Sequence, residues 1–513
     1  MSNQSIEAAK AYHQATKHSY WSVRSRAHFL DWENRPLPFK IYSTLEPIPL
    51  PSPMDRPPEM PALEAIAGLS AQPEGDSLPD LHTLARILYF AAGITKRQQY
   101  PGGEIHFRAA SCTGALYETE LYLVCGPLPD LEAGVYHFGV HDFALRRLRR
   151  GDYRGVLVQA SGGEPSISHS PAVIVSTGTY WRNAWKYQAR TYRHFFWDSG
   201  TILANLLAVS YALQVPARIV MGFVDEEVNR LLDLDTEREV SLSLISLGQV
   251  SEPPPEVQGA LAPLNYPTVP LSKREVDYPP MQKMHGASVL ASAEEVRAWR
   301  GKVSPAQAPE PTGRLFPLQP FSEEAISRDP IYRVILRRGS TREFARRPIS
   351  FAQLSTMLSC ATRGTPADFL EPLGTQLNDL YLIVHAVEGL PSGAYFFHRD
   401  QKALELLKEG EFRQEAGYLG LEQELPADAS VDVFFMADLN RVLERFGNRG
   451  YRAIQLEAGI LGGKLYLAAY AQHLGATGLT FYDDDVTEFF SPHAAGKSSI
   501  FLVALGLSAR QKA

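Results

Sequence analysis

Tyr122-Leu-Val in the first half of the chain is followed by Gly134-Val-Tyr136-His-Phe138 and then by Tyr192-Arg193 and Gly200. The second half repeats this pattern as Tyr381-Leu-Ile, Gly393-Ala-Tyr395-Phe-Phe397, Tyr451-Arg452 and Gly459, at a constant offset of 259 positions. Aromatic, glycine and arginine positions rarely stay in register over such a length by chance. We therefore interpret the chain as a duplicated domain whose two copies pack against each other as an internal pseudo-dimer.

The composition predicts a soluble globular protein. A chain of 513 residues exceeds one typical domain, and its hydrophobic share of 45% can supply large cores. The net charge of −7 comes without a long basic run, which argues against binding to nucleic acid or to an anionic membrane surface. The most apolar stretch, at 201–215, is shorter than the ~20 residues of a membrane span, and the first residues lack the features of a signal peptide.

Neither the cysteines nor the histidines predict a metal site. Cys112, Cys125 and Cys360 are too few and too unpatterned for a disulfide framework or a zinc site, so we expect a reduced, cytoplasmic protein. His137 and His141 are four residues apart in an expected hairpin, where that spacing does not bring both side chains to one metal. The chain also lacks the glycine motif of a Rossmann nucleotide site and the elbow motif of a serine hydrolase.

Proline-rich stretches divide the chain into four parts. We expect an extended N-terminal arm at 1–75, a first copy at 76–250, a proline-rich connector at 251–325 and a second copy at 326–513. The helical pattern at 81–93 corresponds to that at 351–362, and the pattern at 191–213 predicts a long helix. Short apolar runs at 121–125 and 172–176 predict strands. This mixture predicts an α+β class in which each copy buries a sheet beneath helices.

A basic cluster precedes the opening helix of the second copy: Arg337-Arg338-Gly339-Ser340-Thr341-Arg342-Glu343-Phe344. Three arginines and two hydroxyl groups within six residues can donate several charge-assisted hydrogen bonds to one phosphate dianion. Taken alone, the cluster is equally well interpreted as a solvated basic turn.

Two segments of the first copy also carry candidate chemistry. Arg108-Ala-Ala-Ser111-Cys-Thr113-Gly114-Ala-Leu-Tyr117 sets small hydroxyl residues beside a glycine, which lets backbone N–H groups approach a flat polar ring. Trp181-Arg-Asn-Ala-Trp-Lys186-Tyr187 ends on an adjacent lysine and tyrosine, which suit an acid–base pair because burial lowers the pKa of a lysine and a phenol donates a proton. Taken alone, the first segment is more often a turn, and the second an exposed pair without a role.

Together these segments resemble the flavin-dependent nitroreductase superfamily. The R-R-x-S-x-R-x-F start is similar to its flavin phosphate site, and 108–117 resembles the R-x-x-S-x-x-G-x-L-Y segment of its thiazoline and oxazoline dehydrogenases, the SagB/ThcOx type. Lys-Tyr with the following Arg-x-Tyr-Arg and Asp-x-Gly, at 186–200, resembles the catalytic segment of that branch. Tyr12-His13-x-x-Thr16-Lys17-His18 and Phe39-Lys40-x-Tyr42 resemble its N-terminal region. The resemblance implies a nitroreductase-like fold built as an intertwined dimer, with FMN bound at the interface by both partners.

The two copies have lost complementary parts of that site. The first copy has no equivalent of 337–344, and the second has Arg445 and Phe446 at the positions of Lys186 and Tyr187. The resemblance implies that the phosphate residues come from one subunit and the Ser-Gly turn and Lys-Tyr pair from the other. We therefore expect one composite site and one FMN per chain, in a chain that can be monomeric. The expected cofactor-binding residues are Arg337, Arg338, Ser340, Arg342, Arg108, Ser111, Thr113, Gly114, Gly478, Leu479, Thr480, Lys497 and Arg510.

The expected function is that of an FMN-dependent oxidoreductase with Lys186 and Tyr187 as catalytic residues. In its most specific form, the substrate is an azoline-type heterocycle in a modified peptide, and Lys186 or Tyr187 removes a carbon-bound proton while a hydride passes to the flavin. The alternatives are NAD(P)H-dependent reduction of nitro compounds or quinones, and a flavin-sequestering protein without turnover. The retained Lys186-Tyr187 pair favours an enzyme, because a flavin store needs no acid–base pair.

Overall fold

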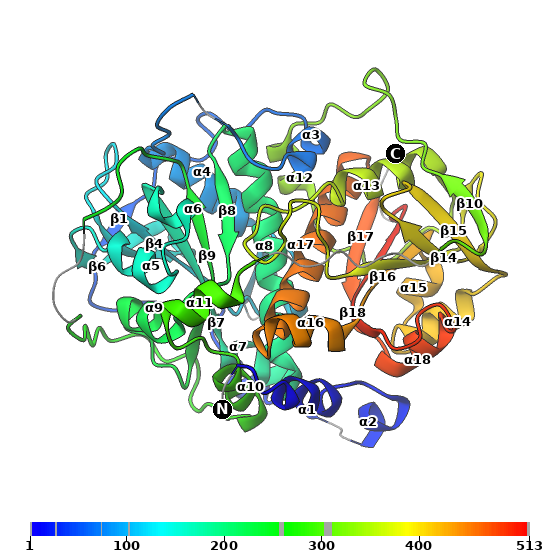
Figure 1. Cartoon of the computed structure of the whole chain (residues 1–513), viewed down its shortest axis with the longest axis horizontal. Helices are drawn as coiled ribbons and strands as arrows, with labels where there is room; N and C mark the ends of the chain where they lie inside the picture. Colours follow the sequence, from blue (N-terminus) through cyan, green and yellow to red (C-terminus); the bar gives the residue numbers. More distant parts are fainter. Residues whose placement is uncertain are drawn as a thin grey trace.

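Two seven-stranded antiparallel sheets with the same strand order form the two halves of the molecule (Figure 1). The structure is a computed structural model and describes residues 3–25, 28–72, 74–100, 103–255, 261–301 and 310–509. The first sheet runs in the order β1 (Pro47–Pro49), β6 (Ala144–Arg150), β5 (Gly134–Gly139), β4 (Thr119–Cys125), β7 (Ala172–Thr179), β9 (Glu239–Leu247) and β8 (Ala217–Val220). The second runs in the order β10 (Arg314–Pro317), β15 (Ala403–Glu409), β14 (Gly393–His398), β12 (Asp379–Val384), β16 (Val431–Ala437), β18 (Ser498–Gly506) and β17 (Gly475–Leu479). The expected duplication and α+β class are confirmed by this matched order.

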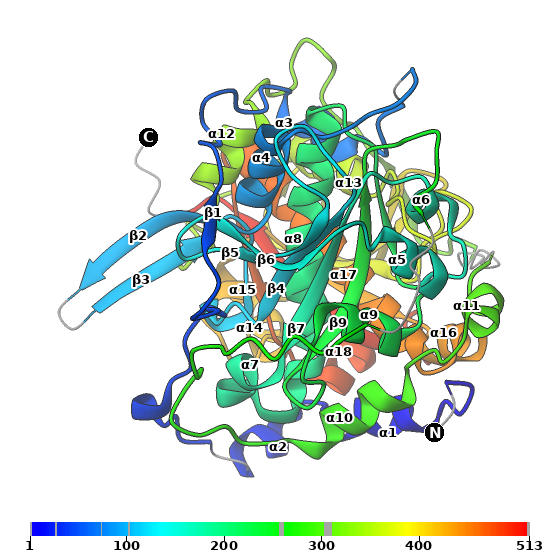
Figure 2. The same ribbon diagram turned by 90° about the vertical axis from the view of Figure 1, so that its left-hand side faces the viewer.

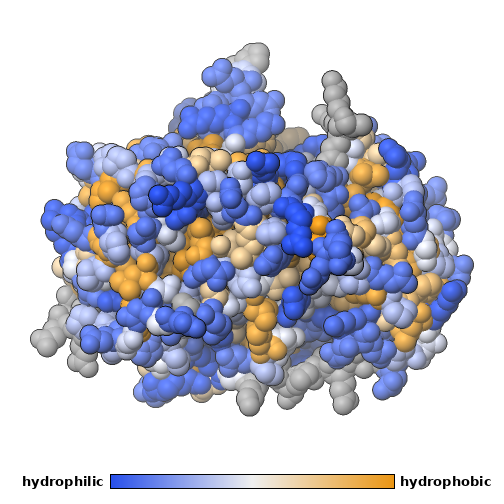
Figure 3. Space-filling view, turned by 90° about the horizontal axis from the view of Figure 1, so that it is seen from above, coloured by the Kyte–Doolittle hydropathy of each residue, from blue (hydrophilic) through white to orange (hydrophobic). Residues whose placement is uncertain are grey.

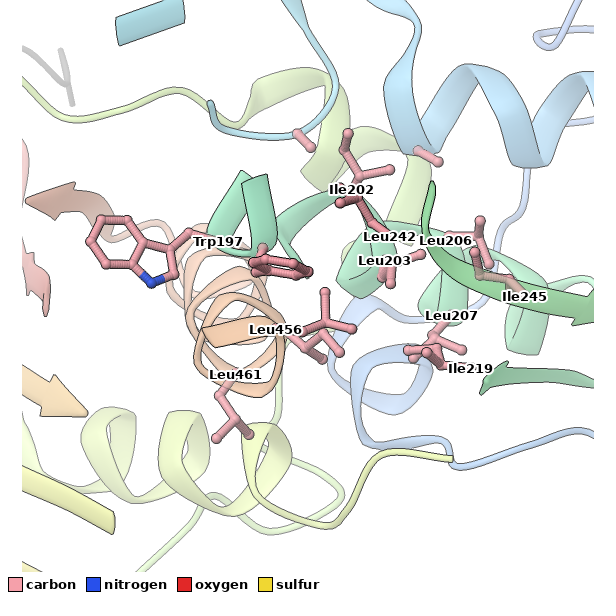
Figure 4. Close-up of a cluster of buried hydrophobic side chains, with 14 of the residues drawn as sticks. Trp197, Ile202, Leu203, Leu206, Leu207, Ile219, Leu242, Ile245, Leu456 and Leu461 are labelled. Atoms are coloured by element: carbon pink, nitrogen blue, oxygen red, sulfur yellow. The ribbon is translucent and has the colours of Figure 1, made fainter. Parts of the chain in front are cut away.

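Two long helices form the centre of the molecule between the sheets. They are α8 (Thr191–Ala212) and α17 (Arg449–Ala471), and nearly every residue of both is buried (Figure 1). The helices meet at Gly200 and Gly459, where a Cβ on Gly200 would lie 2.6 Å from the Gly459 carbonyl carbon. Close approach of two backbones is possible only without side chains, so these glycines fix the crossing point. Leu203 and Leu206 of α8 then pack beside Ile245 of the first sheet (Figure 4).

Each copy contains the helix that the sequence predicts near its start, although in the second copy the short helix α12 (Ile331–Arg337) precedes it. Helix α4 (Leu81–Ala92) starts at Asp80, whose carboxylate accepts a hydrogen bond from the Thr83 amide. Its counterpart α13 (Phe351–Ala361) starts with a capping box between Ser350 and Gln353. Such caps satisfy amide groups that the first turn of a helix leaves without partners. The remaining helices of the first copy are α5 (Arg154–Ala160), α6 (Pro165–Ser168), α7 (Tyr180–Tyr187) and α9 (Asp225–Leu232), and those of the second are α12 (Ile331–Arg337), α14 (Arg413–Leu419), α15 (Glu424–Asp428), α16 (Leu439–Phe446) and α18 (Asp483–Phe489).

The arm and the connector carry more regular structure than their prolines predict. The arm forms α1 (Glu7–Ala15), α2 (Tyr20–Ser25), α3 (Ala62–Ala67) and edge strand β1, and the connector forms α10 (Pro279–Ala287), α11 (Ala293–Trp299) and edge strand β10. In Figure 1 helices α1 and α2 lie along the lower side of the molecule, α1 below its centre and α2 below the second half. Prolines are tolerated here because an edge strand leaves some amides outside the ladder and a helix needs no amide donor in its first turn.

Two small sheets complete the fold. A hairpin of β2 (Ile94–Tyr100) and β3 (Gly103–Arg108) projects from the body of the first copy (Figure 2), and β11 (Ile349–Ser350) pairs with β13 (Val387–Glu388). Seen from above, hydrophobic patches on the surface are interrupted by polar residues (Figure 3). Among the described residues, every helix is too short or too polar to cross a membrane.

Buried ion pairs tie the copies together in a reciprocal way. Arg190 and Arg193 of the first copy bond to Asp483 of the second, at 3.1 and 2.6 Å. Their counterparts Arg449 and Arg452 bond to Asp225 of the first copy, at 2.6 and 2.7 Å. Nothing in the spacing of these residues along the chain indicates the pairs. The two helices α9 and α18 therefore each begin with a buried carboxylate that binds arginines of the opposite copy.

Candidate functional site

A cavity of about 390 Å³ lies between the two copies, which is within the usual range for a cofactor or small-molecule site. Its walls come from the turn after β3, the end of α7, the first turns of α8, the segment after α12 and the end of β17. The lining residues are His18, Ser111, Cys112, Thr113, Gly114, Ala115, Lys186, Tyr187, His194, Trp197, Asp198, Thr201, Ser340, Arg342, Gln423, Tyr466, Thr477, Gly478, Leu479, Thr480 and Phe501. The cavity thus brings together eight of the thirteen expected cofactor residues and both expected catalytic residues.

The turn at 111–114 is held in place by one carboxylate of α8. Asp198 accepts hydrogen bonds from the Thr113 amide at 2.9 and 3.0 Å and from the Thr113 hydroxyl at 2.9 Å. Gly114 adopts a φ of 64°, and a Cβ there would lie 2.9 Å from the Tyr187 hydroxyl. A glycine is required at this point both by the left-handed backbone and by the close approach of the tyrosine.

Behind this turn, Cys112, Glu118 and Asp198 form a buried acidic cluster. The Cys112 thiol lies 3.4 Å from Glu118 and 3.2 Å from Asp198, and the ligand atoms of all three residues lie within 4.8 Å of one another. Burial raises the pKa of the Cys112 thiol well above its ordinary value, and the negative charge of Asp198 adds to this shift. A protonated thiol can donate to a carboxylate, which accounts for these contacts without a metal. The expected absence of a metal stays a prediction.

Lys186 and Tyr187 stand at the end of α7, on the first-copy side of the cavity. The helix stops there because Gln188 takes a left-handed φ of 51°. The Lys186 ammonium lies 5.2 Å from the centre of the Tyr187 ring, whose edge packs against His194 at a ring separation of 4.7 Å. Partial burial lowers the pKa of Lys186, and the positive charge of Arg342 lowers it further. Burial raises the pKa of Tyr187, and the negative charge of Asp198 raises it further. The two neighbours are therefore shifted so that the amine deprotonates more easily and the phenol less easily.

The second copy supplies the opposite wall. Ser340 lies 3.3 Å from the Tyr466 hydroxyl, which in turn accepts a hydrogen bond from the Gly478 amide at the end of β17. Arg342 is exposed at the cavity and has no ion-pair partner among the described residues. An arginine fork without a carboxylate partner is available to an anionic ligand.

Several cavity residues were not foreseen as site residues. His18 of the arm forms a hydrogen bond with the Thr480 hydroxyl at 3.1 Å. Burial lowers the pKa of His18 to about 3, and the nearby charge of Arg190 contributes to this shift. Trp197 lies beside His194 at a ring separation of 5.0 Å and donates to Gln455 at 2.6 Å. His18 stands inside a motif that was noticed in the sequence, but nothing in the spacing indicates that the arm folds back to the interface. Trp197 directly precedes the Asp-x-Gly motif, which was the available signal.

The other expected cofactor residues lie outside the lining. Arg337 donates to Asp329 and to the Tyr470 carbonyl, at 2.6 and 2.7 Å, while Arg338 donates to the backbone carbonyls of Arg108 and Ala109. Their guanidinium groups thus join chain segments rather than face the cavity.

Arg108 and Lys497 are also engaged elsewhere. Arg108 donates to the Pro38 carbonyl at 2.5 Å, and Lys497 pairs with Asp379 at 2.7 Å. Arg510, the last expected residue, lies outside the described residues. A basic residue near a motif is a weak signal for a ligand, because backbone carbonyls and carboxylates of the fold compete for it.

The pseudo-equivalent position in the other half of the molecule is occupied by the chain itself. Ile219 of β8, the counterpart of Gly478, bonds through its amide to the Pro366 carbonyl and through its carbonyl to the Asp368 amide. The Asp368 carboxylate accepts from the amides of Met221 and Gly222 at 2.9 and 2.8 Å. Segment 363–371 therefore pairs with the strand edge that remains open in the first site.

Comparisons with known proteins agree with the duplicated architecture. Residues 335–506 match the nitroreductase family. A candidate nitroreductase of Methanocaldococcus jannaschii is 26% identical over 160 residues, which is 30% of this chain and 81% of the relative. The crystal structure of a candidate nitroreductase from Anabaena variabilis is 25% identical, with a TM-score of 0.78 over 98% of this chain and 99% of that one. The likeness to the Anabaena protein covers both copies. Residues 335–506 are thus similar to the nitroreductase family, and a nitroreductase-like fold extends over both halves.

Proposed function

We propose that the chain is an FMN-dependent oxidoreductase with a single flavin site in the cavity between the copies. The observation that carries this proposal is the convergence of Ser340 and Arg342 from one copy with 111–114 and Lys186 from the other around one space of about 390 Å³. The nitroreductase family match over 335–506 supports an oxidoreductase independently of that geometry.

The residues at this cavity fit a flavin phosphate. Arg342 and Lys186 both line it, and the Arg342 and Arg35 charges act on the pKa of Lys186 in the same direction, which places three cations near one another. None of the three has an ion-pair partner in the part of the chain that the structure describes. Arg342 and Arg35 repel each other unless an anion lies beside them, so a phosphate held by Arg342 is the matching ligand, and Lys186 is left to act as a base. Ser340 and Arg342 would hold the phosphate, and 111–114 and 478–480 the ring.

The acid–base pair suits removal of a proton and a hydride from a carbon centre. A bound flavin supplies the two-electron acceptor for the hydride. Lys186, with its lowered pKa, takes the carbon-bound proton, and Tyr187 remains protonated and donates a hydrogen bond to the substrate. Loss of that proton and hydride leaves a new double bond in the substrate. An azoline-type heterocycle in a modified peptide, which becomes aromatic in this step, is the substrate class that we propose.

Flavin content provides the first experiment. Purified protein should be yellow, with one non-covalent FMN per chain by absorbance. Replacement of Arg342 by alanine should weaken FMN binding roughly 10- to 100-fold, because a hydrogen bond to a charged group contributes about 1.5–3 kcal/mol. Arg346→Ala is the matched control, since Arg346 is exposed nearby but pairs with Asp428 instead. Colourless protein that takes up no added FMN, or two FMN per chain, would contradict the proposal.

Substrate specificity requires a second measurement. Under anaerobic conditions, a peptide azoline should bleach the flavin absorbance in a single turnover. Fast bleaching by NADPH together with no response to azolines would instead favour a nitro or quinone reductase. No bleaching by either would favour a flavin store.

A further inference from the structure

His194 of α8 lies on the wall of the cavity between the copies, and the chemistry above assigns it no part. Its side chain is otherwise buried, with 2% of the residue exposed. The imidazole ring lies 4.7 Å from the ring of Tyr187 and 5.0 Å from that of Trp197. The imidazole is therefore held between two other cavity residues, one of which is the proposed hydrogen-bond donor to the substrate.

Two neighbouring polar groups determine which ring nitrogen of His194 carries the proton. The Asn183 Oδ1 atom lies 2.9 Å from His194 Nδ1 and also accepts a hydrogen bond from the Thr191 hydroxyl at 2.9 Å. An amide oxygen can only accept, so Nδ1 is the donor and Nε2 carries a lone pair. Burial lowers the pKa of His194 well below its ordinary value, and the nearby charge of Arg190 adds to this shift. The ring therefore stays neutral.

The unprotonated nitrogen of this ring is open to the cavity. His194 Nε2 forms no hydrogen bond with the residues that the structure describes, and it is not shielded as the Nε2 atoms of His13 and His285 are. The charged groups of the same cavity wall, on Lys186 and Arg342, are hydrogen-bond donors. An acceptor set among such donors needs a ligand that supplies an N–H or O–H group.

The closed half of the molecule lacks all three polar groups of this network. At the offset of 259 positions, the counterparts are Val442 for Asn183, Gly450 for Thr191 and Ala453 for His194. The ion pairs of Asp483 and Asp225, which hold the copies together, are kept in both halves. The network of Asn183, Thr191 and His194 thus accompanies the open cavity and is not a requirement of the fold.

The substrate class proposed above supplies a matching donor. In a modified peptide, the carbonyl group attached to an azoline ring continues into the amide N–H of the next residue. Tyr187 stays protonated and donates, because burial raises its pKa, while His194 accepts. The two side chains that touch each other thus offer one donor and one acceptor, which is what a peptide group with its carbonyl and its N–H requires.

We propose that His194 contacts the substrate and accepts a hydrogen bond from the peptide N–H that follows the heterocycle. This inference rests on the proposed function. It adds that the cavity prefers a heterocycle followed by a secondary amide over one whose amide has no N–H.

Binding of the product heterocycle tests this contact without turnover. The probes are the N-methylamide and the N,N-dimethylamide of 2-methylthiazole-4-carboxylic acid, of which only the first has an amide N–H. Calorimetry on the full-length, FMN-loaded protein measures both affinities. The parent should bind the N-methylamide about 3- to 10-fold more tightly, which is the usual net effect of one neutral hydrogen bond.

Two variants and a control locate the preference. His194→Phe keeps an aromatic ring beside Tyr187 and should bind both amides equally while retaining FMN. His194→Ala, which introduces the residue of the closed half, is a second arm with the same expected result. His169→Phe is the control and should keep the preference, because His169 is exposed and bonds to the Val250 carbonyl outside the cavity.

The outcomes separate this contact from the proposed function. A preference that survives in both His194 variants would come from the bulk of the extra methyl group and would overturn the contact. Loss of FMN from these variants would overturn it as well, because the imidazole would then serve the cofactor. A parent that azoline peptides reduce but that binds both amides equally would contradict this inference alone. A parent that binds neither amide would contradict the proposed substrate class together with it.

Discussion

The two pseudo-equivalent sites differ in what occupies the same strand edge. At the end of β17, residues 478–480 border an open cavity, whereas the matching edge of β8 is paired with segment 363–371. Lys464 of α17 reinforces this closure by donating to the Gly364 carbonyl at 2.7 Å. One half of the duplicated fold thus keeps room for a ligand, and the other half has filled that room with its own backbone.

The comparison shows how a duplicated fold can lose one site without losing stability. A strand edge that no ligand covers leaves amides and carbonyls exposed, and a loop that pairs with it satisfies them. The catalytic pair was replaced in the same half, since Arg445 and Phe446 stand where Lys186 and Tyr187 stand in the other. The reciprocal ion pairs of Asp225 and Asp483 persist in both halves, because they hold the copies together rather than the ligand.

The largest difference between the two sites should appear in chemistry. Lys186→Met is expected to keep FMN but to slow substrate-driven flavin reduction by about 10²- to 10⁴-fold, the usual contribution of a general base. In the parent protein, this rate should rise with pH through a value below the ordinary pKa of lysine, because burial and Arg342 lower the pKa of Lys186. Anaerobic stopped-flow absorbance measures both effects.

The matched control exchanges the counterpart in the closed half. Arg445→Met alters the equivalent position, whose side chain donates to the Arg300 carbonyl at 3.1 Å and does not line the cavity between the copies. Its reduction rate should equal that of the parent. A parent-like rate in Lys186→Met, or a slow rate in Arg445→Met, would remove the functional difference between the halves.

The ion pairs should reveal what the halves share. Asp483→Asn and Asp225→Asn each leave two buried arginines without a charged partner, and each should lower the free energy of unfolding by about 3–5 kcal/mol. Denaturant unfolding monitored by circular dichroism measures this loss. Only Asp483 also accepts from the amide of His18, a cavity residue, so only Asp483→Asn should in addition weaken FMN binding. An equal loss of FMN affinity in both variants would show that the difference between the halves is not local.

Much of this architecture could be predicted from the sequence because its signals are local or periodic. The helix over 81–92 follows from its apolar spacing and the long helix over 191–212 from its length, and the offset between the copies follows from their repeated aromatic and glycine positions. The resemblance also brought together ten residues that now line one cavity, eight of them as cofactor residues and two as catalytic residues.

What could not be predicted depends on contacts between distant parts of the chain. The residues adjacent to an arginine in the sequence do not indicate which carboxylate it binds. Arg337 pairs with Asp329, whereas Arg193 pairs with Asp483 of the other copy. The closure of one site by 363–371 is equally hidden, because it depends on pairing with β8, which lies far away in the sequence. The order of the arm and the connector also comes from packing, which overrides the local preference of proline-rich sequence.

Substitutions at the crossing point of the two central helices should lower stability equally, whichever of the two helices carries them. Gly459→Ala would place a Cβ 2.5 Å from the Trp197 carbonyl oxygen, and Gly200→Ala would meet the Gly459 backbone. Overpacking of this kind costs about 1–3 kcal/mol, so both variants should unfold at lower denaturant concentration. Gly286→Ala in α10 is the control, because a Cβ there meets nothing within 4 Å and should stabilise the helix by roughly 0.5–1 kcal/mol. Unequal losses at positions 200 and 459 would argue against a symmetric crossing.

The smallest expected effect concerns the carboxylate that closes the second site. Burial raises the pKa of Asp368 to about 6, above the ordinary value of 3.8. Between about pH 4 and pH 6 the folded chain therefore keeps a proton that the unfolded chain has released, so the contribution of Asp368 to stability is complete below about pH 4 and is lost as the pH rises to about 6.

Asp368→Asn should remove this dependence. As the pH rises over that window, the unfolding free energy of the parent should fall by roughly 1–3 kcal/mol relative to that of the variant. One pKa unit corresponds to about 1.4 kcal/mol. Denaturant titrations at pH 4, 5, 6 and 7 measure the shift. The FMN content should stay at one per chain, because loosening 363–371 supplies no phosphate-binding arginine to that half. A constant stability difference across the window would show that Asp368 is ionised throughout, and a second bound FMN would show that the segment alone keeps the second site closed.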